Sequence, residues 1–96
     1  MWEQRQLGRT KLRVTTLGLG TATMGGSRIP ITRAEGEAIV SAAWQAGVRY
    51  FDTAPFYGAG LSEIRLGKQL APHPRDDCVL STKVGRHDLY AGNHAL

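Results

Sequence analysis

Two side chains near the middle of the chain could together move a proton: the carboxylate Asp52 and a phenol five positions later, Tyr57. Asp52 lies at the end of an apolar stretch that begins at Val48, and Tyr57 follows in a turn-rich loop. A nearby cation favours the phenolate and lowers a pKa that is ordinarily about 10. Lys83, near the end of a later apolar run, could supply that charge, and the phenol could then donate or accept a proton.

Spacing by itself also permits a purely structural interpretation. Asp52 and Lys83 could form a salt bridge that ties two strands together, with Tyr57 in a surface loop. An aspartate, a loop tyrosine and a lysine at a strand end are each common. The residues alone therefore leave both an acid–base site and a structural ion pair open.

An acid–base site requires strands that end on the same side of a sheet. Strands are predicted over 16–20, 48–53 and 78–84, with helices over 33–46 and from Ser62 onward. Strands that alternate with helices pair in parallel through right-handed crossovers, and their carboxyl ends lie at one edge. Asp52 and Lys83 are then expected at neighbouring strand ends.

Local signals set the element boundaries. Thr32 and Glu35 have the spacing of a capping box, and Gly47 is typical of a helix C-terminus. Ser62 is expected to cap the second helix. Residues 2–15 predict a β-hairpin around a glycine-containing turn. The buried stripe of the first helix is predicted to comprise Ala38, Ile39, Ala42, Ala43 and Ala46.

Composition restricts the classes of function. The 96 residues allow one domain, and the net charge of +4 comes from scattered Lys and Arg without interleaved aromatics. We therefore expect no nucleic-acid partner. No apolar run is long enough for a membrane span, and the N-terminus lacks a signal core, so a cytoplasmic protein without membrane contact is expected. Cys78, the only cysteine, is expected to be buried and excludes a thiolate metal site.

Several longer strings resemble the aldo-keto reductase superfamily. They are LGLGT at 17–21, GVRYFDTAPFY at 47–57, Ser62 and Glu63 with Leu66, Gly67 and Leu70, and STKV at 81–84. The string from Ala54 to Gly60 is most similar to the branch that oxidises aldoses, such as fucose and threo-aldoses, and pyridoxal with NAD(P).

The resemblance implies an oxidoreductase that transfers hydride between NAD or NADP and a small-molecule carbonyl or sugar substrate. It implies that Tyr57 is the general acid/base and that Lys83 and Asp52 tune its pKa. The residues that it places beside the nicotinamide are Gly20, Thr21, Ala22 and Asp52.

The fold implied by the resemblance is a (β/α)8 TIM barrel whose bottom is closed by an N-terminal hairpin. A complete barrel takes roughly 250 residues. Residues 1–96 are therefore expected to form part of one such NAD(P)-dependent domain, an N-terminal fragment: the hairpin, the first three strands and two helices. Residues 86–96 are expected to be a tail outside the family pattern or disordered, and neither His87 nor His94 matches the family's fourth site residue. We expect little turnover from these residues alone.

An incomplete barrel also predicts an open sheet face. Val48, Tyr50, Val79 and Ser81 would lie on it, and its exposure would favour self-association. Two other functions stay open. The family includes channel-associated regulatory subunits, so a non-catalytic interaction role is one alternative. A small doubly wound domain with a structural Asp52–Lys83 pair is the other.

Overall fold

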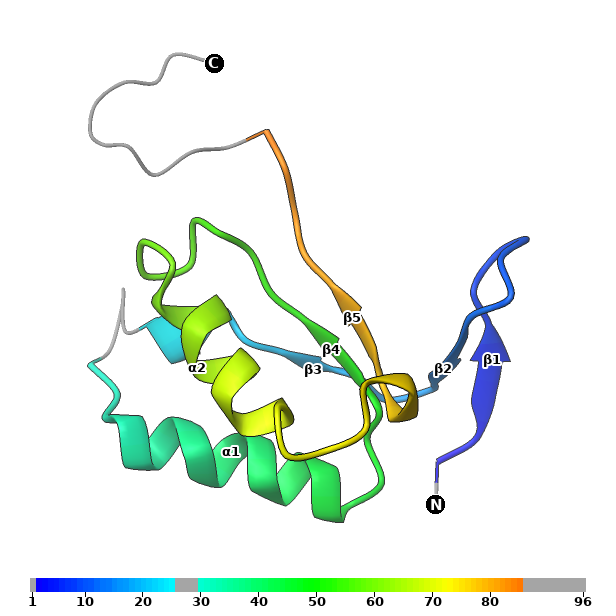
Figure 1. The fold of residues 1–96 in the computed structure, drawn as a ribbon, viewed down its shortest axis with the longest axis horizontal. Coiled ribbons are helices and arrows are strands. Elements are labelled where there is room, and N and C mark those ends of the chain that lie inside the picture. Colours follow the sequence, from blue (N-terminus) through cyan, green and yellow to red (C-terminus); the bar gives the residue numbers. More distant parts are fainter. Residues whose placement is uncertain (1, 26–29, 86–96) are drawn as a thin grey trace.

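In the computed structural model, which describes residues 2–25 and 30–85, the strands form two sheets (Figure 1). The first is the predicted hairpin, with β1 (Gln4–Gln6) antiparallel to β2 (Arg13–Thr15). The second is parallel and contains β3 (Leu19–Gly20), β4 (Tyr50–Asp52) and β5 (Val79–Ser81), with β4 in the middle. The strands are shorter than predicted, but their order and direction are confirmed.

Helices form the connections between the parallel strands. They are α1 (Arg33–Gln45), α2 (Leu61–Leu70) and the short 3₁₀ segments η1 (Ala22–Gly25) and η2 (Arg75–Asp77). The capping box of α1 is confirmed: the Thr32 amide donates to Glu35 Oε1 at 2.8 Å, and the Glu35 amide donates to Thr32 Oγ1 at 3.1 Å. Gly47 follows α1 with a φ of 98°, as a C-terminal glycine does.

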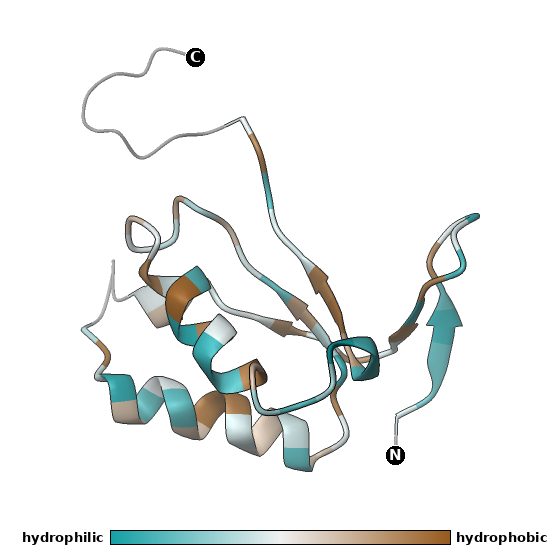
Figure 2. Cartoon of the chain, viewed as in Figure 1, coloured by the Kyte–Doolittle hydropathy of each residue, from teal (hydrophilic) through white to brown (hydrophobic). Residues whose placement is uncertain are grey.

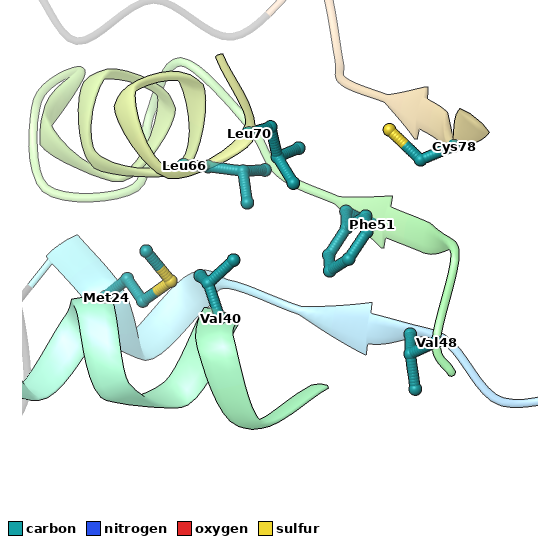
Figure 3. Packing of buried hydrophobic residues seen from close by; sticks show 7 residues of the cluster. All are labelled: Met24, Val40, Val48, Phe51, Leu66, Leu70 and Cys78. Carbon is teal, nitrogen blue, oxygen red and sulfur yellow. The ribbon is translucent and has the colours of Figure 1, made fainter. Parts of the chain in front are cut away.

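The core lies between the parallel sheet and the two helices, which sit on the same side of it (Figures 1 and 3). Phe51 of β4 is fully buried there against side chains from both helices. The cluster comprises Met24, Val40, Val48, Phe51, Leu66, Leu70 and Cys78. Cys78 is buried as predicted, and burial raises the pKa of its thiol.

The face of α1 that packs on the sheet differs from the predicted one. Gly36 and Val40 are buried and Trp44 is half-buried, whereas Ala38, Ala42 and Ala46 are exposed. Apolar residues occupy most of the circumference of α1, so their spacing alone does not select a face. Val40 and Trp44 bury more apolar area than alanine can, and they decide which side packs inward.

The opposite face of the parallel sheet has no helix over it among the residues described. Tyr50 and Asp52 flank the inward-pointing Phe51, so they point to this open side. Val48 was expected here, but it is buried in the core. The alternation of side chains between the two faces starts only at Tyr50, where β4 begins. Val48 lies between the turn at Gly47 and the strand, and it points to the side of the sheet that the helices cover. Figure 2 shows that β1 is hydrophilic along its length, whereas β5 is hydrophobic.

The parallel sheet is open and does not close into a barrel within the described ranges. Within the same ranges, no helix has the length and hydropathy that crossing a membrane requires. The predicted tail over 86–96, with His87 and His94, lies outside the described residues.

Candidate active site

The carboxyl ends of β4 and β5 bring Asp52 and Lys83 together. Asp52 pairs in register with Ser81, and Lys83 follows two residues later. The Lys83 ammonium donates to Asp52 Oδ2 at 2.9 Å and to the Thr53 carbonyl at 3.0 Å. Both side chains stay partly exposed, at 48% for Lys83 and 38% for Asp52. The pair is therefore open to a ligand.

Tyr57 lies next to this pair. The Lys83 Nζ is 5.2 Å from the centre of the Tyr57 ring. The pKa of Lys83 is raised, first by its hydrogen bond to Asp52, while the little burial that it has opposes the rise and Tyr57 adds to it. Asp52, Lys83 and Tyr57, which the sequence singled out, thus lie within one small region at the strand ends.

The other carboxylate oxygen of Asp52, Oδ1, has a partner that the sequence analysis missed. Ser81 Oγ donates to Asp52 Oδ1 at 2.6 Å, and the Tyr50 hydroxyl lies 3.2 Å from Ser81 Oγ. The pKa of Asp52 is lowered, first by the hydrogen bond from Ser81 and then by the one from Lys83, against a small opposing effect of burial. The sequence pattern that could have identified Tyr50 and Ser81 is the alternation of side chains along a strand. It places Tyr50 on the same face as Asp52, and Ser81 on the same face as Lys83.

The loop that carries Tyr57 is fixed by a close backbone contact. A Cβ atom on Gly25 would lie 2.5 Å from the Gly58 amide nitrogen, so the two chain segments touch where side chains are absent. Gly58 also has a φ of 64°, which favours glycine. This contact joins the loop after β3 to the loop after β4, and it sets where the phenol lies relative to the strand ends.

A cluster of three buried hydroxyls lies beneath the site: Thr21, Thr53 and Ser62. Ser62 Oγ is 2.8 Å from Thr21 Oγ1 and 3.0 Å from Thr53 Oγ1, and Thr21 Oγ1 donates to the Asp52 carbonyl at 2.9 Å. The prediction that Ser62 caps α2 is wrong. Gly60 precedes the helix with a φ of 94° and no side-chain cap, and Ser62 instead turns inward from the first turn. Its hydroxyl helps to hold the ends of β3 and β4 together.

The residues expected beside a nicotinamide lie at the end of β3. Gly20 pairs in register with Asp52, is exposed, and has no atom within 4 Å of where a Cβ would be. Ala22 is also exposed, whereas the Thr21 side chain is fully buried and bonded to the hydroxyl cluster. The surface beside Asp52 is therefore open. Thr21 could contact a ligand there only through its backbone.

A hollow of about 640 Å³ lies at the opposite, amino end of the strands. Arg49 and Arg75 both line it. Arg49 Nη1 donates to the carbonyls of Trp44 at 2.7 Å and of Val48 at 2.8 Å, and the guanidinium lies 3.7 Å from the centre of the Trp44 ring. Arg75 Nη1 donates to the Cys78 carbonyl at 3.0 Å. These cations are already engaged with the backbone, which indicates a structural role at this end.

The sequence comparisons agree on one family. The profile of the Aldo/keto reductase family matches residues 16–95, so the match continues past Gly85. The chain is 54% identical over 84 residues to pyridoxal 4-dehydrogenase of Microbacterium luteolum, covering 88% of this chain and 24% of that protein. It is 51% identical over 75 residues to D-threo-aldose 1-dehydrogenase of a Pseudomonas species, covering 78% and 23%. The chain thus spans about a quarter of the length of these relatives.

Solved structures give the same result. The holo form of an aldo-keto reductase from Bacillus halodurans superposes with a TM-score of 0.82 at 33% identity, over 96% of this chain and 29% of that one. A glycerol dehydrogenase from Gluconobacter oxydans superposes with a TM-score of 0.68 at 27% identity, over 91% and 28%. The hairpin, the three parallel strands and the two helices therefore correspond to part of a TIM barrel.

Proposed function

Since the chain belongs to the aldo/keto reductase family, we propose that it carries the proton-transfer part of an NAD(P)-dependent oxidoreductase. The reaction is the interconversion of an alcohol or hemiacetal and a carbonyl in an aldose-like substrate. The observation that carries this proposal is the position of Lys83, whose ammonium is 2.9 Å from Asp52 and 5.2 Å from the Tyr57 ring centre. Relatives named for a pyridoxal and a threo-aldose support the substrate class.

Each of the three side chains has one role in the mechanism. In carbonyl reduction the Tyr57 hydroxyl gives its proton to the substrate oxygen as the carbon–oxygen π bond breaks, and in alcohol oxidation the phenolate takes that proton back. Lys83 stabilises the phenolate by its charge. Asp52 keeps the Lys83 ammonium charged and holds it in place. A bound nicotinamide, beside Gly20, Ala22 and Asp52, would supply or accept the hydride.

The proposal can be tested on a barrel that contains this site. Residues 1–85 are joined to the part of pyridoxal 4-dehydrogenase that follows its matched segment. We expect this chimera to reduce NAD⁺ or NADP⁺ when it is given an aldose or pyridoxal, as followed by nicotinamide absorbance. A folded chimera that turns over none of these substrates with either cofactor contradicts the proposal.

The 96 residues alone are expected to give no turnover and no tight cofactor binding, because they span about a quarter of the relatives' length. Adding NADH or NADPH should leave the nicotinamide fluorescence unchanged, and a dissociation constant in the micromolar range would contradict this. The open face around Tyr50 and Val79 is expected to cause self-association, which light scattering over a range of concentrations can measure.

A further inference from the structure

Asp52 lies in a chain of hydrogen bonds that runs along the open face of the parallel sheet. Tyr50 lies 3.2 Å from Ser81 Oγ, and Ser81 Oγ lies 2.6 Å from Asp52 Oδ1. Lys83 Nζ is 2.9 Å from the other carboxylate oxygen, Oδ2. Each oxygen of Asp52 therefore has a different donor, and the two donors lie on the same stretch of chain, two residues apart.

The direction of the chain follows from the hydrogens available. A serine hydroxyl has one hydrogen, and that of Ser81 is given to Asp52 Oδ1. Ser81 must then accept in its contact with Tyr50, so the Tyr50 hydroxyl is the donor. Both hydroxyl dipoles point toward the carboxylate, and such alignment strengthens each bond in the chain.

Tyr50 is itself held by the neighbouring strand. A Cβ atom on Gly18 would lie 2.8 Å from Tyr50 Cδ2, so the ring lies directly against the backbone before β3. Only glycine leaves room for the ring there. The contact with Gly18 limits where the ring can lie, and the hydroxyl at its far end reaches Ser81.

We propose that Ser81 and Tyr50 are positioning residues for proton transfer at Tyr57. Ser81 holds Asp52 Oδ1, which turns Oδ2 toward the Lys83 ammonium, and Tyr50 holds the Ser81 hydroxyl. The inference rests on the proposed oxidoreductase function, because it assigns these residues to the same site.

A second anchor is needed because the ion pair is exposed. An aspartate carboxylate rotates easily about χ2, and an exposed ion pair contributes only about 0–1 kcal/mol. Lys83 alone would therefore hold Asp52 loosely. The hydrogen bond from Ser81 is the largest cause of the lowered pKa of Asp52, which indicates that this bond also favours the charged form that Lys83 requires.

The test is a titration of the Asp52 carboxyl carbon by NMR in the 96-residue chain, without substrate or cofactor, at a concentration where light scattering shows the chain to be monomeric. In the unsubstituted chain we expect a midpoint below the ordinary aspartate value. Ser81→Ala should move that midpoint upward, Tyr50→Phe should move it upward by less, and Ser81→Thr, which keeps the hydroxyl, should restore it.

Thr82→Val is the matched control. Thr82 Oγ1 donates to Glu63 Oε2 at 2.6 Å, so it makes the same kind of bond from the next residue to a different carboxylate. This change should leave the Asp52 midpoint where it was. An Asp52 midpoint that Ser81→Ala does not move, or one at the ordinary value in the unsubstituted chain, overturns the proposal.

Turnover by the chimera separates this inference from the proposed function. Ser81→Ala should lower kcat about tenfold, the loss expected for one hydrogen bond to a charged group, with the substrate KM unchanged. An inactive chimera with a depressed Asp52 midpoint contradicts the oxidoreductase function, and with it the role in proton transfer, although Ser81 would still hold the Asp52 carboxylate. If the chimera is active and Ser81→Ala leaves its kcat unchanged, the positioning role is contradicted and the oxidoreductase function is supported.

Discussion

Two cations at opposite ends of the parallel sheet, Lys83 and Arg49, have different kinds of partner. Lys83, beyond the carboxyl end of β5, contacts a carboxylate and a phenol, both of which can exchange a proton. Arg49, before the amino end of β4, contacts two backbone carbonyls and the face of Trp44, none of which can. If the proposed function is right, the same positive charge serves proton transfer at one end of the sheet and only stabilises the fold at the other.

The residue type fits each task. A guanidinium stays charged at any working pH and stacks on aromatic rings, so Arg49 suits a fixed structural contact. A lysine ammonium is a compact charge that responds to its surroundings. The comparison predicts that changes at the carboxyl end affect turnover far more than stability, and that changes at the amino end do the reverse.

The largest expected effect is at Tyr57. Tyr57→Phe in the chimera should lower kcat by about 10³-fold, because general acid–base catalysis contributes about 10²–10⁴-fold and a phenylalanine ring has no proton to give. Cofactor affinity, measured by fluorescence titration, should stay within about twofold. Loss of both in equal measure would point to a structural role for Tyr57.

The next effect is on stability at the amino end. Arg49→Met should lower the free energy of unfolding by about 2–3 kcal/mol, since it removes charged hydrogen bonds to two carbonyls and the contact with Trp44. Urea unfolding of the 96-residue chain measures this loss. Arg33→Met, which breaks an exposed pair with Glu37 at 3.6 Å, is the control and should cost under about 0.5 kcal/mol. If Lys83→Met destabilises the chain more than Arg49→Met does, the comparison is wrong.

The smallest effect is the pH dependence of stability. The pKa of Asp52 is lower in the folded chain than in the unfolded chain. Its contribution to stability is therefore complete above the ordinary aspartate pKa and is lost as the pH falls through the folded-state pKa. The pKa of Lys83 is higher in the folded chain than in the unfolded chain. Its contribution to stability is therefore complete below the ordinary lysine pKa and is lost as the pH rises through the folded-state pKa. Asp52→Asn should therefore cost stability near neutral pH, by under about 1 kcal/mol, and cost nothing in strong acid.

Urea midpoints at several pH values measure this dependence, and Arg49→Met supplies the contrast. The hydrogen-bond partners of Arg49 are two backbone carbonyls, which are not ionisable. The cost of Arg49→Met should therefore be the same at each pH where Asp52→Asn is measured. A cost of Asp52→Asn that does not change with pH would mean that the carboxylate is not part of the ion pair in solution.

The features that the sequence predicted well depend on short-range signals. The capping box of Thr32 and Glu35 needs only neighbours in the chain, and so does the C-terminal stop at Gly47. The pairing of Asp52 with Lys83 followed from strand order, because parallel strands end at the same edge. The resemblance supplied the barrel, and the family match excludes the alternative of a small doubly wound domain.

The features that were missed depend on tertiary packing. Ser62 resembles a helix cap in sequence, yet it turns inward because buried Thr21 and Thr53 offer partners that the sequence does not place. The inward face of α1 was decided by how much area Val40 and Trp44 bury. Ser81 and Tyr50 were seen as strand residues only, since their contact with Asp52 depends on the register between β4 and β5.

The central claim, that the cation at the carboxyl end serves chemistry and the one at the amino end serves structure, is tested most directly by one paired measurement. kcat is determined for Lys83→Met and Arg49→Met in the chimera, at a temperature where circular dichroism shows both to be folded. We predict that Lys83→Met loses about 10²–10⁴-fold in kcat and that Arg49→Met stays within about threefold of the unsubstituted protein. Equal losses in the two variants would contradict the account.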